Sequence, residues 1–551
     1  MDGWDYEFDL LVAGSGAGAM AAALAAKQKG LDSVVLEKTE YYGGSTALSG
    51  GGLWIPDNYL MAEAGIHDSL EDARVYMNNT VGERVQKAKQ EAYITRAREM
   101  LVYLRDNSHA TFQIMQGYPD YYPEEPGGTA GGRALEPVLF EGRRLGRILD
   151  QLRPHPYMPS AIAFTLVDWM QFSMARANKS NLVGAVRFIF RTFLNIVLRK
   201  RHLTLGRALV GRLRLSLHET NVPVWLNTGV TGLIVENGRV VGVEADRDGK
   251  RIRIHGKKGV VLAAGGFAHN REMREKHGQH PATSEWTCAS PGNTGEAIQM
   301  GVKAGAAVDL MDDAWWGPTT LMFGGPPLFL VTERAYPGAM MVDSNGKRFV
   351  NESAPYIDVV HSMYQRDGKD SITIPSHFVM DRRYRSKYFF GLLAPGITPR
   401  NYLKQVHFFK AHTLGQLADQ AGIDPQGLVE TVERFNEFSR TGKDQDFGRG
   451  DSIYDRFYAD PCVKPNPCLA PIDQPPFYSV KIYPGDLGTK GGLVTNEHAQ
   501  VLREDGTAID GLYAIGNTSA SVMGNSYPGP GATIGPSMTF GYIAALHAAD
   551  H

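Results

Sequence analysis

The first apolar run of the chain is short and leads directly into glycines. Phe8 to Ala13 (FDLLVA) predicts a buried strand, Met20 to Lys29 has the composition of a helix, and Ser33 to Leu36 (SVVL) predicts a second strand. Between the first strand and the helix stands Gly14-Ser-Gly-Ala-Gly-Ala19. A strand, a glycine turn, a helix and a strand in this order form the βαβ context in which such a motif binds a dinucleotide.

Each small residue of this turn has a physical reason. Gly14 allows the tight turn, Gly16 lets backbone amides approach a pyrophosphate, and Ala19 keeps the helix close to the strand. Glu37 ends the second strand, where a carboxylate accepts hydrogen bonds from ribose hydroxyls, whereas an NADP site would favour a basic residue. An ordinary glycine-rich turn is the alternative for the turn alone. The predicted binding residues here are Gly14, Ser15, Gly16, Ala17, Gly18, Ala19, Glu37 and Lys38.

Later segments show two further patterns. Val224 to Val243 alternates apolar and polar residues around Glu236-Asn-Gly238, which predicts a β-hairpin. Between about Trp315 and Leu487 no cofactor motif occurs, but Leu414 to Phe438 has helical patterning. We therefore expect a separate unit inserted into the dinucleotide-binding domain.

The segment from about 155 to 203 predicts an amphipathic helix. Arg187, Arg191, Asn195 and Arg199 recur every fourth residue and form a narrow polar stripe on a helix. The apolar remainder comprises Val183, Val186, Phe190, Phe193, Leu194 and Val197. Between Asp168 and Glu219 stand ten Lys or Arg and no acid, and the arginines interrupt a run too short to span a bilayer. The helix either packs on its own protein or a second subunit, or lies on anionic lipid with the basic stripe at the headgroups. We favour peripheral membrane contact through 180–205.

Composition and charge narrow the class of protein. The 57 Lys and Arg against 59 Asp and Glu give a net charge of −2 over 551 residues, which argues against a nucleic-acid partner. At roughly 100 to 200 residues per domain, the length predicts about three units. The three cysteines, Cys288, Cys462 and Cys468, provide neither a disulfide framework nor a metal site. With an acidic N-terminus unlike a signal peptide, we expect a cytoplasmic protein, attached to the inner face of the cell membrane if the helix binds lipid.

A second glycine-rich loop suggests a larger, permanently held cofactor. Lys38 to Trp54 reads KTEYYGGSTALSGGGLW, directly after the ribose carboxylate. Here the chain resembles the FAD-dependent flavoproteins of the fumarate reductase and 3-ketosteroid dehydrogenase family, in which this loop wraps the FAD diphosphate. Val260 to Phe267 (VVLAAGGF), Asn293 to Ala297 (NTGEA) and Gly511 to Asn517 (GLYAIGN) extend the resemblance. It implies FAD contacts from Gly43, Gly44, Ser45, Thr46, Ser49, Gly50, Gly51, Val230, Ala264, Gly265, Gly266, Gly295, Gly516, Asn517 and Ile534.

Tyrosine motifs select the branch of this family. Where fumarate reductases carry Thr-Arg, a cation and a proton donor for a dicarboxylate, this chain has Ala354-Pro-Tyr356. Like the 3-ketosteroid Δ1-dehydrogenases it also carries Pro119-Asp-Tyr-Tyr122 and, from Ser519 to Gly531, SASVMGNSYPGPG. Asp486 to Gly492 (DLGTKGG) resembles the segment that re-enters the FAD domain in these enzymes.

The resemblance implies a role for each catalytic residue. Tyr527 and the Gly531 amide would bind the C3 oxygen of a 3-ketosteroid, Tyr356 would remove the C2 proton, and Tyr121 would relay that proton outward, as C1 passes a hydride to flavin N5. Tyr122 competes with Tyr121 for this role. A free phenol titrates near ~10, so we expect hydrogen-bond donors or the flavin to hold Tyr356 closer to working pH, with activity favoured at alkaline pH.

The predicted fold is α/β: a Rossmann-like FAD-binding domain of the glutathione-reductase type, from 1–313 and 489–551, with an α+β catalytic cap from 314–488. The expected partners are a 3-ketosteroid and a small electron acceptor such as a quinone. Three alternatives stay open: a 3-keto-5α-steroid 4-dehydrogenase, a fumarate-reductase-like enzyme, and a membrane-bound FAD protein that relays electrons without binding a substrate. No metal is expected.

Overall fold

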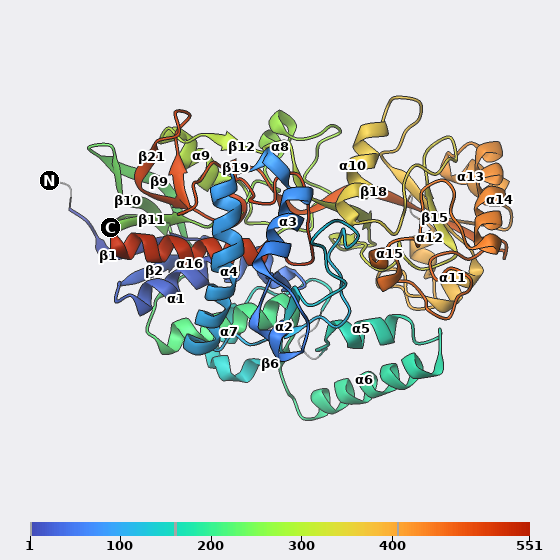
Figure 1. Ribbon diagram of the computed structural model, residues 1–551, viewed down its shortest axis with the longest axis horizontal. Coiled ribbons are helices and arrows are strands. Elements are labelled where there is room, and N and C mark those ends of the chain that lie inside the picture. The colour runs from blue at the N-terminus through green and yellow to red at the C-terminus, as the bar shows by residue number, and fades with distance from the viewer. Residues whose placement is uncertain (1–2, 159–161, 405–406) are drawn as a thin grey trace.

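The computed structural model of the protein describes residues 3–158, 162–404 and 407–551. The molecule is elongated, with two sheets at its two ends and both chain termini beside the first sheet (Figure 1). The strands outside these two sheets and the helices not described below are β3 (Leu53–Trp54), β4 (Phe112–Ile114), β5 (Ala134–Pro137), β6 (Phe140–Glu141), β7 (His202–Leu203), β12 (Val308–Asp309), β19 (Gly492–Leu493), α2 (Tyr59–Glu63), α3 (Leu70–Thr80), α4 (Lys87–Asn107), α7 (Leu205–Glu219), α8 (Arg271–His277) and α9 (Glu296–Lys303).

The first sheet is the dinucleotide-binding sheet that the N-terminal pattern predicted. Its strand order is β20-β21-β11-β1-β2-β8, with β10 and β9 added beside β11. The strands are β1 (Tyr6–Ala13), β2 (Ser33–Leu36), β8 (Val224–Trp225), β9 (Thr228–Glu236), β10 (Arg239–Arg247), β11 (Lys250–Leu262), β20 (Gln500–Leu502) and β21 (Ala508–Ala514). β1 is parallel to β2 and β11, and β11 is parallel to β21. The α/β fold class is therefore confirmed.

The first and last helices pack together through glycines. α1 (Ala17–Gln28) follows the glycine turn, and α16 (Ile534–Asp550) lies alongside it (Figure 1). A Cβ at Gly18 would lie 2.2 Å from Ser537 Oγ, and a Cβ at Gly541 would lie 2.4 Å from the Gly18 carbonyl oxygen. Only glycine permits this approach, so these residues set the distance between the two helices.

The predicted hairpin is present, with a different start. β9 and β10 pair antiparallel, and the turn residues Asn237 and Gly238 both have positive φ, at 50° and 80°, as a two-residue type I′ turn requires. Val224 and Trp225 instead form β8, which pairs parallel with β2.

The second sheet belongs to the inserted segment. Its order is β14-β13-β18-β16-β15, with β17 beside β18. The strands are β13 (Ala314–Leu321), β14 (Pro327–Phe329), β15 (Ala339–Val342), β16 (Ser376–Met380), β17 (Phe408–Ala411) and β18 (Phe477–Thr489), and its helices are α10 (Tyr356–Arg366), α11 (Arg382–Lys387), α12 (Arg400–Leu403), α13 (Leu414–Ala421), α14 (Pro425–Thr441) and α15 (Ile453–Phe457). The helical patterning over 414–438 corresponds to two helices, because Gly422, with φ of 75°, ends α13 and Pro425 begins α14. We propose the domain division at 313/314 and 488/489, since the six strands begin at Ala314 and only Thr489, the last residue of β18, lies beyond these points.

The basic segment from about 155 to 203, described at 155–158 and 162–203, contains two helices, α5 (Leu166–Ser173) and α6 (Lys179–Val197). They lie at the lower edge of the molecule (Figure 1). The polar stripe of α6 does not face outward as a whole, as a headgroup-binding stripe would. Asn195 is buried, and Arg191 pairs with Asp168 of α5 at 2.6 Å and donates to the Ala163 carbonyl. The apolar face of α6 is the exposed one. None of the helices in the described part of the chain is long and apolar enough to cross a membrane.

Candidate active site

A cavity of about 500 Å³ opens at the carboxyl ends of the parallel strands, where ligands bind in open α/β sheets. Of the predicted cofactor residues, those that line it are Gly14, Ser15, Gly16, Ala17, Gly18, Ala19, Glu37, Lys38, Gly44, Ser45, Thr46, Ser49, Val230, Ala264, Gly265, Gly516, Asn517 and Ile534. Gly43, Gly50, Gly51, Gly266 and Gly295 do not line the cavity, although Gly295 precedes α9, whose first residue, Glu296, does.

The N-terminus of α1 faces this cavity, since Ala17, Gly18 and Ala19 of its first turn line it. Gly16 is the N-cap residue, the Ala17 amide donates to Thr46 Oγ1 at 3.2 Å, and the first turn contains no acid. The lining residue Gly44 has open space on its Cα, where a Cβ would come no nearer than 4.0 Å to another heavy atom. The cavity also exposes an arginine, Arg153, whose buried Nε has no partner among the described residues. An anionic pyrophosphate fits these groups.

The predicted ribose-binding carboxylate is already held in place. Glu37 accepts hydrogen bonds from Ser15 Oγ at 2.5 Å and from the amide and hydroxyl of Thr39 at 2.9 and 2.7 Å. Lys38, which the motif also indicated, instead pairs with Glu296 at 2.8 Å and donates to Thr294. Its ammonium therefore connects β2 to α9 across the mouth of the cavity.

Several lining residues were not predicted as cofactor contacts. They come from loops, from strand ends and from the first turn of α16, and they are Arg153, Thr228, Asp246, Ser290, Leu487, Thr533 and Ser537. Among them Thr533 connects the cavity to a second cluster, because its Oγ1 lies 3.1 Å from the hydroxyl of Tyr527.

Three tyrosines from distant segments meet beside Thr533. Tyr121 donates to the Tyr356 hydroxyl at 2.7 Å, and both side chains are buried. The Tyr527 ring lies 5.1 Å from the Tyr121 ring and 5.3 Å from the Tyr356 ring, between centroids. Tyr122, which competed with Tyr121 in the sequence, donates to Asp358 at 3.0 Å instead. The predicted catalytic tyrosines are therefore brought together.

Gly531 completes the cluster. Its φ is 96°, and a Cβ there would lie 2.5 Å from the backbone of Gly52, so no other residue fits without displacement. Its amide donates to no other described residue, which leaves an N–H free for a ligand oxygen.

A buried ion-pair chain holds the loop that carries Tyr121. Asp120 accepts from Trp54 Nε1 at 2.7 Å and from Arg133 Nη1 at 2.8 Å, and Arg133 also pairs with Asp68 at 2.6 Å. Burial raises the pKa of Asp120 to about 6. Asp120 therefore anchors this loop to Trp54 and Arg133, which come from other segments of the chain.

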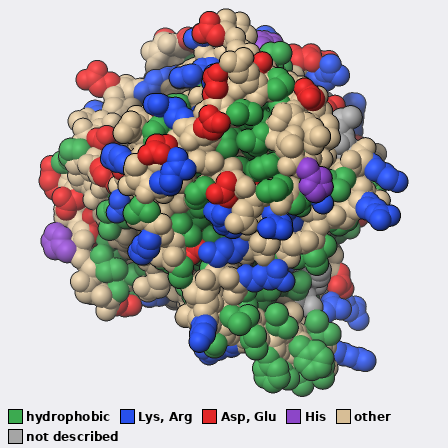
Figure 2. All heavy atoms as spheres, turned by 90° about the vertical axis from the view of Figure 1, so that its right-hand side faces the viewer, with side chains coloured by type: hydrophobic (Ala, Val, Ile, Leu, Met, Phe, Trp, Pro, Cys, Tyr) green, Lys and Arg blue, Asp and Glu red, His purple; other side chains and the backbone are tan. Residues whose placement is uncertain are grey.

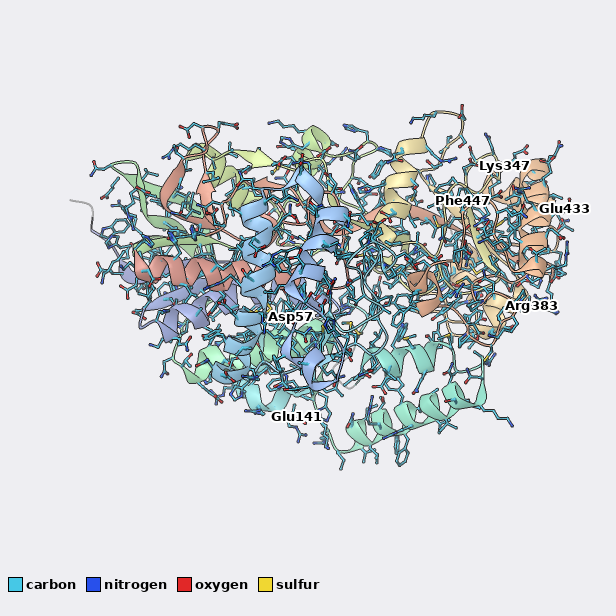
Figure 3. The ribbon with its side chains drawn as sticks, viewed as in Figure 1. Asp57, Glu141, Lys347, Arg383, Glu433 and Phe447 are labelled. Atoms are coloured by element: carbon cyan, nitrogen blue, oxygen red, sulfur yellow. The ribbon has the colours of Figure 1, made fainter. Side chains whose placement is uncertain are left out.

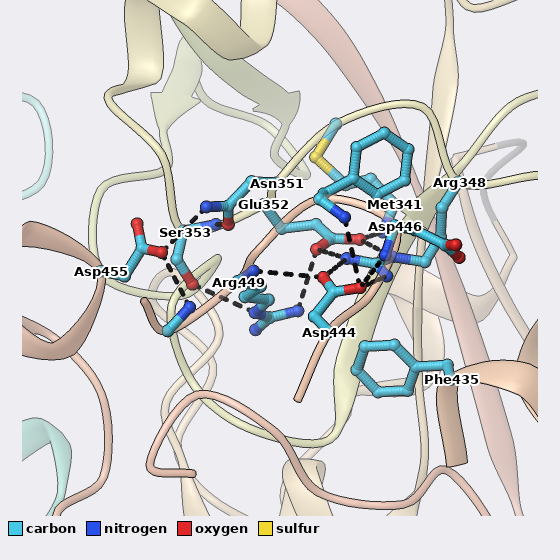
Figure 4. Close-up of polar contacts among 12 residues, drawn as sticks. Met341, Arg348, Asn351, Glu352, Ser353, Phe435, Asp444, Asp446, Arg449 and Asp455 are labelled. Atoms are coloured by element: carbon cyan, nitrogen blue, oxygen red, sulfur yellow. Dashed lines mark hydrogen bonds and ion pairs between the residues drawn. The ribbon is translucent and has the colours of Figure 1, made fainter. Parts of the chain in front are cut away.

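A second buried charge network precedes Tyr356. Arg348 pairs with Glu352 and Asp444, each at 2.8 Å, and Arg449 pairs with Glu352 at 3.1 Å (Figure 4). Two cations and two anions balance one another with almost no exposure. Figure 3 shows the neighbouring Lys347 and Phe447 on the same half of the molecule. The network fixes the segment from which Tyr356 begins α10.

The surroundings of Tyr356 raise its pKa, whereas from the sequence we expected a pKa close to working pH. Burial raises the pKa of Tyr356 well above 10, and the nearby Tyr527 hydroxyl raises it further, while the hydrogen bond from Tyr121 lowers it. The protein groups alone therefore do not bring it near neutral pH, because desolvation outweighs the one donor. Two features favour its anion: the Tyr121 hydroxyl, and its place as the first residue of α10, at the positive end of the helix dipole.

Comparisons with known proteins agree with this geometry. Residues 9–534 match the FAD binding domain family. The 3-oxosteroid 1-dehydrogenase of Mycobacterium tuberculosis is 46% identical over 557 residues, which cover 99% of this chain and 98% of that protein. The crystal structure of 3-ketosteroid Δ1-dehydrogenase from Sterolibacterium denitrificans, in complex with 1,4-androstadiene-3,17-dione, is 38% identical, with a TM-score of 0.94 and 99% of each chain covered.

A third comparison shows the fold alone. The crystal structure of 3-ketosteroid-Δ4-(5α)-dehydrogenase from Rhodococcus jostii is 20% identical to this chain, with a TM-score of 0.65, and it covers 100% of this chain and 98% of its own. The family match makes FAD the cofactor of this protein. With full-length identity of this order, the chain belongs to the 3-ketosteroid Δ1-dehydrogenase family of FAD-binding flavoproteins.

Proposed function

We propose that this protein is an FAD-dependent 3-ketosteroid 1-dehydrogenase, which introduces the C1–C2 double bond into the A ring of a 3-ketosteroid. The observation that carries the proposal is the meeting of Tyr121, Tyr356 and Tyr527 beside Thr533, on the wall of the cofactor cavity. The Gly531 amide, two residues before Thr533 in the chain, donates to no other described residue. The bound FAD supplies the two-electron acceptor. The full-length relatives named above support the same reaction.

The residues divide the chemistry between two positions. The Tyr527 hydroxyl and the Gly531 amide would hold the C3 oxygen, where negative charge develops as the proton leaves C2, and donors preorganised in a dry site stabilise such charge strongly. Tyr356, in its ionised form, would take the C2 proton. Tyr121 donates to Tyr356 and would stabilise that anion and carry the proton away. Because burial raises the pKa of Tyr356, we expect the rate to rise with pH.

Cofactor contacts follow from the same cavity. Glu37 would accept from the ribose hydroxyls, and the α1 N-terminus with Gly14 to Ala19 would bind the pyrophosphate. Leu487, Asn517 and Ile534 line the end of the cavity near Thr533, where the flavin would lie against the tyrosines.

Anaerobic mixing with a steroid tests the function. Androst-4-ene-3,17-dione should bleach the visible flavin band, and Tyr356→Phe should keep FAD but lose this reduction. If only a 5α-saturated 3-ketone bleaches the flavin, the enzyme is a 4-dehydrogenase. If no ketone bleaches it, but a reduced dye does and fumarate then reoxidises the flavin, the enzyme is a dicarboxylate reductase. No response to any of these compounds would indicate a protein that relays electrons. The Ala354-Pro-Tyr356 sequence, which lacks a cation, disfavours the dicarboxylate enzyme.

The electron acceptor that reoxidises the flavin is proposed to be a small molecule such as a quinone. The sequence contains one dinucleotide motif, which the FAD would occupy. NAD as the electron acceptor would therefore have no binding motif of its own. Reoxidation of the reduced holoprotein by a soluble quinone, compared with NAD, distinguishes the two acceptors.

We also propose that the protein rests on the cytoplasmic face of the membrane through α6. Large apolar side chains cover its outer face, with Val183 68% and Phe190 61% exposed. Figure 2 shows apolar side chains gathered at the lower edge of the molecule, with Lys and Arg side chains near them. A patch of this kind is unusual on a monomer, and the flanking Lys179, Arg187 and Arg199 suit anionic headgroups.

Vesicle co-sedimentation tests the membrane contact. The holoprotein should pellet with vesicles containing an anionic phospholipid, and Phe190→Glu combined with Phe193→Glu should abolish pelleting. Val235→Glu is the matched control, since Val235 is 48% exposed on β9, away from α6. Unchanged pelleting of the double variant would end the proposal, and loss of a dimer in sedimentation velocity would assign the face to a second subunit.

A further inference from the structure

Lys490 stands at the point where the chain returns from the second sheet to the first. It directly follows β18, within the GTKGG sequence, and its side chain is fully buried. Its partner Asp313 directly precedes β13, where the chain enters the second sheet. The Lys490 amide donates to the Asp313 carbonyl at 3.1 Å, and the ammonium lies 3.5 Å from Asp313 Oδ2. The two chain crossings are thus joined by one buried ion pair.

Each member of this pair holds a residue just before Tyr527. Lys490 Nζ donates to the Ser526 carbonyl at 2.6 Å. Asp313 Oδ2 accepts from Asn525 Nδ2 at 3.1 Å. The consecutive residues Asn525 and Ser526 are therefore held by the carboxylate and the ammonium of one ion pair. These contacts restrict the backbone just before Tyr527.

The same ammonium supports the side of the Tyr527 ring. Nζ lies 4.7 Å from the centroid of the Trp315 ring, within cation–π distance. Trp315 meets Tyr527 edge to face, at 4.8 Å between centroids, and donates through Nε1 to Asn517 Oδ1 at 3.0 Å. One buried charge thus contacts both the backbone before Tyr527 and the ring packed against it.

We propose that Lys490, paired with Asp313, is a positioning residue that holds Tyr527 in place to bind the ketone oxygen. The proposal rests on the proposed function, which gives Tyr527 its ligand. A buried ion pair alone is weak support for a role beyond stability. The contacts to Ser526 and Trp315 give this one a specific consequence, because a displacement of about 1 Å in a binding group costs up to ~10²-fold in rate.

Titration of Lys490 provides a readout that a purely structural role would not give. Burial lowers the pKa of Lys490 to about 8, and Asp313 opposes this. Lys490 is therefore protonated below about pH 8 and loses its charge above it. Its electrostatic attraction to Asp313 is lost with the charge. Other titratable groups around the pair include Arg84, Asp358, His361, Tyr122 and Tyr527. Burial raises the pKa values of Tyr122 and Tyr527 above 10, so both remain phenols as Lys490 titrates.

The chain contains a matched control lysine. Lys89 is also buried, donates to a backbone carbonyl, that of Ala520, at 2.8 Å, and lies 5.7 Å from the Phe540 ring. Burial lowers its pKa to about 8 as well. It contacts neither Trp315 nor Tyr527 in the described structure, so Lys89→Met should reproduce the loss of a buried charge without the loss of positioning.

The experiment measures binding of 1,4-androstadiene-3,17-dione to the oxidised holoenzyme, through the perturbation of the flavin spectrum. This dienone carries the ketone but no longer has a C1–C2 single bond, so binding is observed without turnover. We expect Lys490→Met to weaken binding at least tenfold, Lys490→Arg to stay within about threefold of wild type, and Lys89→Met to stay within twofold. Binding to wild type should weaken as the pH rises through 8, and Lys490→Arg should abolish that weakening.

Wild-type affinity in Lys490→Met would overturn the proposal, and so would the same alkaline weakening in Lys490→Arg and wild type. If Lys490→Met fails to retain FAD, the pH comparison of Lys490→Arg with wild type decides alone. His361→Gln shows whether this imidazole causes the pH effect, since loss of the effect in that variant would also count against Lys490. Wild-type flavin reduction by androst-4-ene-3,17-dione, measured in parallel, tests the proposed function separately.

Discussion

Replacing Tyr121 by Phe removes one atom from the catalytic cluster and leaves its packing in place. That oxygen makes the 2.7 Å hydrogen bond to the Tyr356 hydroxyl, and this bond lowers the pKa of Tyr356 against the effect of burial. A hydrogen bond to a charged group contributes about 1.5–3 kcal/mol. Its loss from the ionised base therefore corresponds to a ~10- to ~150-fold slower proton removal.

The assay is anaerobic stopped-flow reduction of the flavin by androst-4-ene-3,17-dione across a range of pH. The rate in Tyr121→Phe should fall by this factor at neutral pH, and the rising limb of its pH profile should move to higher pH, because the pKa of Tyr356 rises when its donor is lost. Binding of the ketone should change little, since Tyr527 and Gly531 hold the carbonyl.

Tyr122→Phe is the matched control. Tyr122 is the next residue in the chain and is partly buried, and its hydroxyl donates to Asp358 instead of Tyr356. Equal losses in the two variants would mean that any phenol removed from this loop disturbs it in the same way. A Tyr121→Phe enzyme with wild-type rate and pH profile would refute the role of Tyr121 as the donor to the base.

Three further changes test other parts of the structure. Gly531→Ala should lose ketone binding more than tenfold in a spectral titration, because its φ of 96° and the Gly52 backbone at 2.5 Å leave no room for a Cβ; near-normal binding would contradict this. Glu37→Gln should weaken FAD retention about tenfold in a dialysis assay, since a charged acceptor is lost, and full retention would remove Glu37 from the site. Burial lowers the pKa of His377 from 6.5 to about 4, so the folded state excludes the proton that the unfolded state binds. Stability should therefore fall by up to ~3 kcal/mol as pH drops from 6.5 to 4, and Tm in His377→Gln should fall less; parallel Tm curves would oppose this.

Local patterns predicted the first half of the cofactor site well. β1, α1 and β2 depend on residues within one stretch of the chain, so alternation, glycines and a strand-ending Glu37 are enough to place them. The tyrosine segments were found through motif resemblance, and the structure then separated Tyr121 from Tyr122, which differ only in the direction of their side chains from one loop.

Residues that act through distant partners gave no signal. Arg133 holds Asp120 and Asp68, separated from it by 13 and 65 positions, and nothing near Arg133 in the sequence indicates this pairing. The sequence pattern predicted the polar stripe of α6 but not which way the stripe faces. Arg191 faces inward because it pairs with Asp168, which lies on another helix. Periodicity identifies which residues share a face and leaves open what that face contacts.

The glycine contact between α1 and α16 links the two ends of the chain in time as well as in space. During synthesis the ribosome completes β1, α1 and β2 long before α16, and at about 5–20 residues per second the delay is on the order of a minute. Throughout that interval the surface of α1 around Gly18 lacks its packing partners Ser537 and Gly541. The cavity also lacks the wall that Thr533 and Ile534 provide. A complete FAD site therefore forms only after this last helix has been translated.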